Sequence, residues 1–113
     1  MKIFYNVDVQ MMADHDMTDE LVSELEQALG FTDTDIDERE EYMVVAVFAS
    51  ETDPDEMRHQ IQALLDAHPE IFYFDVIYRY ECEQITERFV MRNDGTTQKF
   101  VGRTVFEEVN DHE

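Results

Sequence analysis

The stretch TDELVSELEQALG (residues 18–30) resembles PDEMRHQIQALLD (residues 54–66), which follows it 36 positions later. Both share an Asp-Glu pair and then apolar residues at four equivalent places. These are Leu21, Leu25, Ala28 and Leu29 in the first copy, and Met57, Ile61, Leu64 and Leu65 in the second. Such spacing places apolar side chains on one face of a helix. The sequence therefore predicts two amphipathic helices, one in each half of a repeated unit.

Signals at the helix ends support both assignments. Gly30 stands where the first helix would end in a left-handed residue. Asp53 can cap the second helix, Pro54 suits its first turn, and Glu56 comes three residues after the cap. The pair at 68–69, His-Pro, is expected to end this helix. Each helix therefore has a predicted boundary.

Three segments are predicted to be strands. Residues 2–11 alternate apolar and polar, as a half-buried strand does. Residues 42–49 are apolar on both faces, which predicts a central strand. Residues 71–80 are aromatic and β-branched, with one face formed by Phe72, Phe74, Val76, Tyr78 and Tyr80. Each helix would thus follow a strand.

Two βα halves, each completed by a further strand, give the order βαββαβ. The missing strand would be a short edge piece within residues 31–37, protected from pairing by its aspartates. Without it, the order would be β-α-β-α-β. The predicted fold class is α+β and resembles the ferredoxin-like folds, with two helices on one face of the sheet. Proteins with unrelated functions share that topology, so the resemblance implies no site.

A β-hairpin is predicted beyond this unit. Residues 85–92 and 97–106 alternate around Asp94-Gly95, which favours a type I′ turn with Phe89 opposite Phe100. The predicted organisation is one α+β domain, residues 1–113. It comprises a ferredoxin-like unit at 1–82, a hairpin extension at 83–107 and an acidic tail at 108–113. The hairpin or a second copy of the chain would cover the sheet face that the helices leave open.

The charge is extreme, with 28 acidic and 8 basic residues and a net charge of −20. It predicts no direct binding to nucleic acid or to anionic membranes. No apolar run approaches the ~20 residues of a membrane span. Residues 1–70 hold 19 acids against 3 bases, a net of −16, whereas residues 71–113 hold 9 against 5, a net of −4. Cys82 stands alone, so the chain is expected to be cytoplasmic and without an internal disulfide.

The stretch DTDIDEREE (residues 33–41) begins like a calcium-binding loop. Its sixth position is Glu38 where such a loop needs Gly, and its twelfth is Val44 where the loop needs Glu. His15 lies between two aspartates but lacks the further ligands of a zinc site. We therefore expect no metal and no cofactor.

No catalytic residue is predicted. Glu81 and Glu83 flank Cys82 and would raise the pKa of its thiol, which makes it a poor nucleophile. The three glycines of the chain form no phosphate-binding loop. Catalysis by paired carboxylates remains an open alternative because their separation in space is not given by sequence. The balance favours a protein that is not an enzyme.

Three hypotheses for function follow. The first is a non-catalytic acidic module that binds a basic protein surface; its sharpest version is a DNA mimic that inhibits a nucleic-acid-binding protein. The second is a small-molecule binder or enzyme built like dimeric ferredoxin-like barrels on the open sheet face, with Tyr73, Asp75 or Arg79 in an enclosed cavity. The third is an acidic globular protein without a charge-driven partner. The acidic face of the first hypothesis comprises Glu20, Glu24, Asp33, Asp35, Asp37, Glu38, Glu40 and Glu41.

A homodimer formed through the sheet is also expected. Two copies that met through their helices would bring like charges together. The C-terminal part of the chain is closer to neutral and combines Arg with aromatic residues, as interfaces do. The predicted interface residues are Tyr73, Arg88, Phe89 and Phe100.

Overall fold

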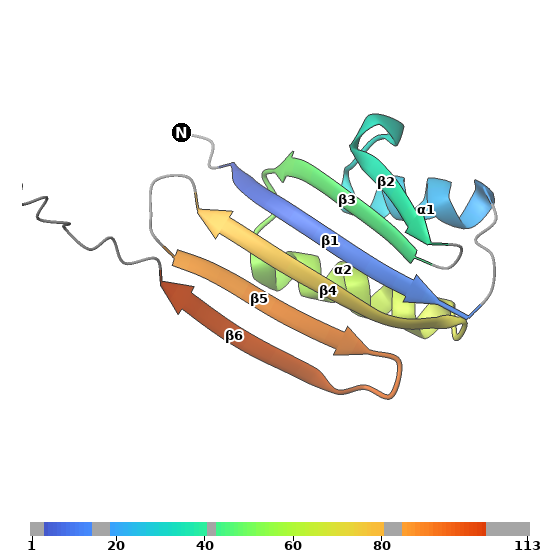
Figure 1. Cartoon of the computed structure of the whole chain (residues 1–113). Coiled ribbons are helices and arrows are strands. Elements are labelled where there is room, and N and C mark those ends of the chain that lie inside the picture. The colour runs from blue at the N-terminus through green and yellow to red at the C-terminus, as the bar shows by residue number, and fades with distance from the viewer. Residues whose placement is uncertain (1–3, 15–18, 41–42, 81–84, 104–113) are drawn as a thin grey trace, which may run out of the picture.

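The computed structural model describes residues 4–14, 19–40, 43–80 and 85–103; for Asp19 and residues 38–40 it describes the backbone alone. His15, Glu41, Cys82 and the predicted tail at 108–113 lie outside these residues. The described chain is α+β, with two helices and a six-stranded antiparallel sheet (Figure 1). Its elements are β1 (Tyr5–Ala13), α1 (Asp19–Leu29), the short 3-10 helix η1 (Asp33–Asp35), β2 (Ile36–Glu40), β3 (Met43–Ser50), α2 (Pro54–Ala67), β4 (Ile71–Tyr80), β5 (Ile85–Arg92) and β6 (Thr97–Arg103).

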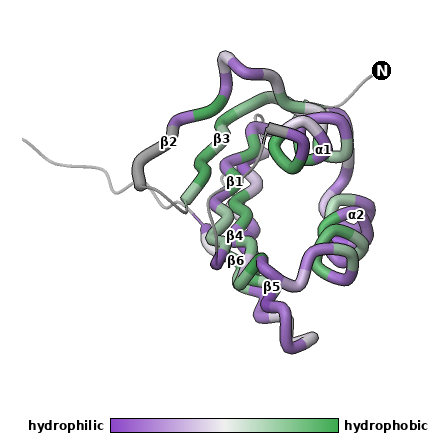
Figure 2. The backbone as a smooth tube through the Cα atoms, turned by 90° about the vertical axis from the view of Figure 1, so that its right-hand side faces the viewer, coloured by the Kyte–Doolittle hydropathy of each residue, from purple (hydrophilic) through white to green (hydrophobic). Residues whose placement is uncertain are grey.

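The strand order of the sheet is β2-β3-β1-β4-β5-β6. β1 lies between β3 and β4, so that Val9 faces Ala46 on one side and Val76 on the other. The β5–β6 hairpin continues the sheet beyond β4. The sheet therefore has two strands more than a four-stranded βαββαβ unit. Both helices lie on one side of this sheet (Figure 2). The hairpin therefore does not cover the other side, contrary to one of the two arrangements expected from sequence.

The hydrophobic core lies between the helices and the sheet. The apolar faces predicted for the two helices are buried, including Leu21 and Leu25 of α1 and Met57 and Ile61 of α2. The Asp53 carboxylate accepts a hydrogen bond from the Glu56 backbone N–H at 2.8 Å, which confirms the predicted cap of α2. Gly30 ends α1 with a φ of +82°, as the sequence predicts.

Alternation in β3 separates a buried face from an uncovered one. Val44, Ala46 and Phe48 point into the core, while Val47 is 56% exposed on the other side. The prediction that β3 is buried on both faces was therefore wrong, since the helices cover one face only. It is an interior strand, next to the edge strand β2 on one side and to β1 on the other.

Phe72 departs from the face predicted for β4. Met12 of β1 pairs with Tyr73, but the next residue, Ala13, pairs with Ile71, so the register skips Phe72. This β-bulge turns Ile71 into the core and leaves Phe72 43% exposed. Phe74, Val76 and Tyr78 keep the predicted inward orientation.

The edge strand is present but begins later than expected. Asp35 accepts a hydrogen bond from the Thr32 backbone N–H at 3.0 Å and closes a capping box around η1. Local hydrogen bonds of this kind compete with strand pairing. β2 consequently starts at Ile36, which pairs with Ala46 of β3.

The hairpin is present, but its register and turn differ from the prediction. Arg88 faces Phe100 and Phe89 faces Lys99, so Phe89 and Phe100 lie on opposite faces of the sheet. Within the turn only Gly95 has a positive φ, +89°, whereas a type I′ turn requires it at two residues.

A longer loop explains the register shift. The Gly95 N–H donates to the Arg92 carbonyl at 3.1 Å, and the Arg92 N–H donates to the Thr96 carbonyl at 3.0 Å. This is a three-residue loop with glycine at its left-handed position. The Asp94 carboxylate accepts hydrogen bonds from the backbone N–H and the hydroxyl of Thr96, at 2.9 and 2.6 Å. These bonds hold the pKa of Asp94 below its usual value.

Candidate functional site

The helix that follows β1 carries an acidic surface. From residue 3 to residue 38 the sequence holds 11 acidic residues and no Lys or Arg. We define the α1 acidic surface as Glu20, Glu24, Glu26, Asp33 and Asp35, which come from α1 and the adjoining η1. All five acids thus lie in α1 or in the short turn beyond it, without a Lys or Arg in the same segment.

Two carboxyl groups of this surface interact directly. Glu26 and Asp33 share a side-chain hydrogen bond, which raises the pKa of Glu26; partial desolvation and the negative charge of Asp33 act in the same direction. The two residues line a hollow of about 310 Å³ together with Val22 and Ser23. A hydrogen bond between two carboxyl groups needs a proton on one of them, so when both are ionised the bond is lost and their two negative charges repel. A cationic side chain entering this hollow would remove that repulsion.

The other predicted acidic residues are distributed differently. Glu24 contacts His68 of the α2–β4 connection, with 3.0 Å between Oε2 and Nε2. Asp35 caps η1, as described above. Asp37 pairs with Val45 of β3 and so belongs to the sheet face turned away from the helices. Glu38 and Glu40 lie in β2. The structure therefore brings Glu20, Glu24, Asp33 and Asp35 to the helical layer and separates Asp37 from them.

Sequence reasoning missed Glu26. The sequence does contain a signal for the Glu26–Asp33 pair. Gly30 ends α1 and reverses the chain, so that Asp33 lies beside the last turn of the helix. An acid placed shortly before a helix-ending glycine and another placed shortly after it are candidates for such a pair.

The opposite face of the sheet is close to neutral. We call it the open sheet face: the side chains of the strands that point away from the helices, among them Asp8, Val47, Asp75, Arg88 and Phe100. Arg88 makes two hydrogen bonds to Asp75, at 2.9 and 2.6 Å, which raise the pKa of the guanidinium group. Its Cζ also lies 5.5 Å from the centre of the Phe100 ring.

A second ion pair joins Arg79 to Asp8 on the same face. Of the four residues proposed for a dimer interface, Tyr73, Arg88 and Phe100 share this face. Phe89 does not, because it is 1% exposed on the helix side, where Arg58 covers its ring at 5.3 Å. Phe89 is therefore a core residue, and its assignment to the interface is corrected. The reason is the pairing of β5 with β4, which sets Phe89 opposite the buried Val76, while the hairpin register places Phe100 on the other face.

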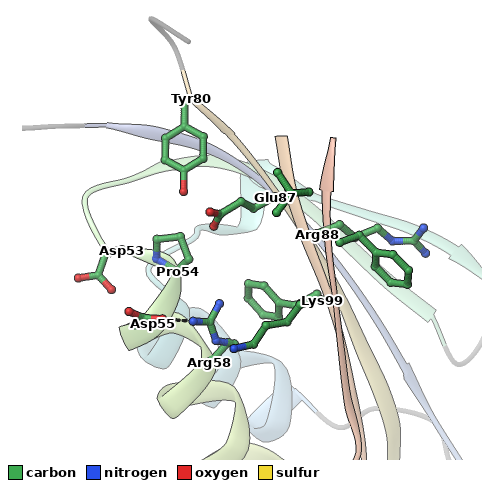
Figure 3. Close-up of a pocket in the computed structure, with 11 residues that line it drawn as sticks. Asp53, Pro54, Asp55, Arg58, Tyr80, Glu87, Arg88 and Lys99 are labelled. Atoms are coloured by element: carbon green, nitrogen blue, oxygen red, sulfur yellow. Dashed lines mark hydrogen bonds and ion pairs between the residues drawn. The ribbon is translucent and has the colours of Figure 1, made fainter. Parts of the chain in front are cut away.

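A cleft of about 370 Å³ lies between the start of α2 and the hairpin (Figure 3). Asp53, Pro54 and Arg58 form one wall, and Glu87 and Lys99 approach from the strands opposite. Arg58 is already paired with Asp55. Acids and bases thus alternate around this cleft, which favours neither an anion nor a cation.

The residues expected in an enzyme's cavity lie elsewhere. Tyr73, Asp75 and Arg79 do not line the cleft of Figure 3. Asp75 borders a hollow of about 200 Å³ on the open sheet face, beside Gln10 and Val47. Ligand pockets usually measure roughly 300 to 1,000 Å³. Asp75 and Arg79 are also occupied by their ion pairs, so this hollow offers little for chemistry.

Neither metal ligands nor membrane spans stand out in the described chain. Among those residues, no group of three or more His, Cys, Asp or Glu side chains could hold a metal ion. Within the same residues, neither helix has the length and hydropathy needed to cross a membrane.

The fold and its surfaces define an acidic α+β domain that has one charge-balanced sheet face. No protein-family model, no curated protein and no solved structure matches the chain. Its function must therefore be inferred from its own surfaces.

Proposed function

We propose that this protein is a non-catalytic interaction module whose α1 acidic surface binds a basic protein surface. The observation that carries the proposal is the Glu26–Asp33 carboxyl pair beside an open hollow. Two like charges held in contact lower the stability of the free protein and favour a bound cation. A Lys or Arg side chain beside either carboxylate would offset this repulsion, and the attraction would grow as the partner excludes water from the hollow.

The uneven placement of basic residues supports the same proposal. Two of the described arginines, Arg79 and Arg88, neutralise aspartates on the open sheet face, and Arg58 pairs with Asp55 on α2. None lies in the segment that forms the α1 acidic surface. Acidity that served only solubility would need no such segregation.

A DNA mimic is the more specific version of this function. Duplex DNA carries about one charge per 1.7 Å of its axis. Glu20 and Glu24 stand one helical turn apart, about 6 Å along α1. The helix alone is therefore less densely charged than DNA, and a mimic would also have to use η1 and β2. Binding to a basic protein surface in general is the primary proposal.

We also infer that β1 to β4 with the two helices form a ferredoxin-like unit that the hairpin extends. The element order β1-α1-β2-β3-α2-β4 and the antiparallel pairing of β1 with both β3 and β4 support this. The unit would act as a rigid scaffold that presents α1.

A synthetic Arg- and Lys-rich peptide serves as the probe, with affinity measured by calorimetry at low and high salt. The test variant is Glu26→Gln with Asp33→Asn. The matched control is Glu56→Gln with Asp66→Asn, which removes the same two charges from exposed positions on α2. We expect the test variant to bind several-fold more weakly than the control, and salt to weaken binding of the wild type. Equal losses in both variants, or no binding at all, would refute the proposed site.

The wild type and both variants can then be used to capture partners from a native lysate. A partner retained by the wild type and the control but lost by the test variant would be a specific one. Displacement of that partner by duplex DNA would support the DNA-mimic version.

A further inference from the structure

The open sheet face has no covering layer among the described residues. Both helices lie on the other side of the sheet, as Figure 2 shows, and the hairpin continues the sheet instead of folding over it. Val47 and Phe100 on this face are 56% and 47% exposed. Val45, Tyr73 and Ile77 add apolar surface between them. An antiparallel sheet can leave one face in water, but the exposed apolar side chains on this face would be covered by a second layer.

The composition of this face differs from that of the rest of the chain. The sequence contains 15 glutamates, yet none of the open-face side chains of β1, β3, β4, β5 and β6 is a Glu or a Lys; in β2, Glu40 pairs with Met43 of this face. The face instead carries aromatic, Met and Arg residues, such as Tyr73, Met12 and Arg88. Protein interfaces are enriched in these residue types and depleted in Lys and Glu.

Among the side chains that the structure describes, charge is balanced on this face. Asp8 is paired with Arg79 and Asp75 with Arg88, so the two ion pairs at its centre carry no net charge. Arg92, which donates to Gln98 at 2.8 Å, contributes a further positive charge, and Asp37 at the β2 edge contributes a negative one. A second molecule that approaches from this side meets little of the net charge of −20.

The area of the face suits a dimer. Six strands spaced about 4.8 Å apart, each about eight residues long, cover roughly 800 Å². A standard interface buries about 800 Å² on each partner. The face is therefore large enough for stable association without any other contact.

We propose that the open sheet face binds the same face of a second copy of this chain, in a two-fold symmetric dimer. A strongly basic or acidic partner would find no complementary charge here, whereas a second copy brings an equally neutral and apolar surface. Identical faces meet in a two-fold dimer, so Val47 and Phe100 of each copy become covered. The α1 acidic surfaces of the two copies then point outward, as far from each other as the sheets allow.

The dimer and the proposed binding of a basic partner respond to salt in opposite ways. Salt screens the long-range repulsion between two chains of −20 each, so it should strengthen the dimer. The same screening weakens binding of a cationic partner to α1. The two proposals can therefore fail independently.

Light scattering across a range of salt and protein concentrations tests the dimer. The test variant is Val47→Glu, on the open sheet face. The matched control is Val101→Glu, because Val101 is 74% exposed on β6 but follows Lys99 on the helix side of the sheet. We expect the wild type and the control to reach about twice 13.4 kDa at high salt. Val47→Glu should stay monomeric, with a circular dichroism spectrum like that of the wild type.

Amide NMR spectra of the wild type provide a second measurement that does not depend on a variant. Raising its concentration should shift the signals of Val45, Val47 and Ile77 and leave those of α1 unchanged. A wild type that is monomeric at every salt concentration would overturn the proposal. So would a dimer that survives Val47→Glu, or one that Val101→Glu disrupts equally.

Discussion

The hydroxyl of Tyr78 donates a hydrogen bond to the backbone carbonyl of Thr52, at 3.0 Å. Tyr78 is fully buried in β4, and burial, followed by the charge of Asp53, raises the pKa of its hydroxyl, so the group remains a donor at any ordinary pH. The bond ties the middle of the sheet to the segment that starts α2. Tyr78→Phe should lower the free energy of unfolding by about 1 to 2 kcal/mol, because the Thr52 carbonyl loses its partner. Urea denaturation measures this, and an unchanged stability would show that the bond contributes nothing.

The cap of α2 allows a conservative comparison. Asp53→Ala removes the acceptor for the Glu56 N–H and should cost about 1 kcal/mol. Asp53→Asn keeps an oxygen in the same place and should lose much less. Thermal unfolding of the two variants checks the prediction, and equal losses would contradict the role assigned to the side chain.

The Glu26–Asp33 pair predicts a particular pH dependence. The pKa of Glu26 is raised in the folded state. The protonated form of Glu26 therefore stabilises the folded state at a pH below the pKa of the unfolded chain, about 4.3. This contribution is lost as the pH rises through the higher pKa of the folded state. Glu26→Gln mimics the protonated form and should make the protein more stable than the wild type at neutral pH. This advantage should disappear in acid, and a constant difference between pH 4 and pH 7 would contradict the pairing.

Gly95 tests the hairpin turn. Its φ of +89° is unfavourable for a β-branched residue, so Gly95→Val should cost at least about 1 to 2 kcal/mol. Gly102→Val is the control, because Gly102 has an ordinary φ and a Cβ there would lie 3.8 Å from the nearest atom, the Thr86 carbonyl oxygen. Guanidinium denaturation should show a much larger loss for Gly95→Val. Similar losses would mean that backbone strain at Gly95 is not the cause.

Local signals predicted the helices well. The repeat at 18–30 and 54–66 gave both apolar faces, and the Asp53, Pro54 and Glu56 pattern gave the start of α2 within one residue. These features depend on neighbours three or four positions away, which a sequence displays directly.

Features that depend on distant partners were less accessible. The bulge at Phe72 arises where β1 and β4 change register, and the residues near Phe72 in the sequence do not predict it. The hairpin register depended on whether two or three residues form the loop, and that single residue decided that Phe100 lies on the face opposite Phe89. The neutrality of the open sheet face rests on pairs such as Asp8–Arg79, which are 71 positions apart in the sequence.

The central position of β1 has a consequence for synthesis on the ribosome. Val9 pairs with Ala46 and with Val76, so its second neighbour is made 67 residues later. At roughly 5 to 20 residues per second, this leaves one edge of β1 without its partner for about 3 to 13 s. During that time the growing chain exposes the strand to any other unpaired strand nearby. Over the same interval the chain gains most of the acidic residues of its first 70 positions, and their repulsion opposes contact between neighbouring nascent chains until β4 arrives.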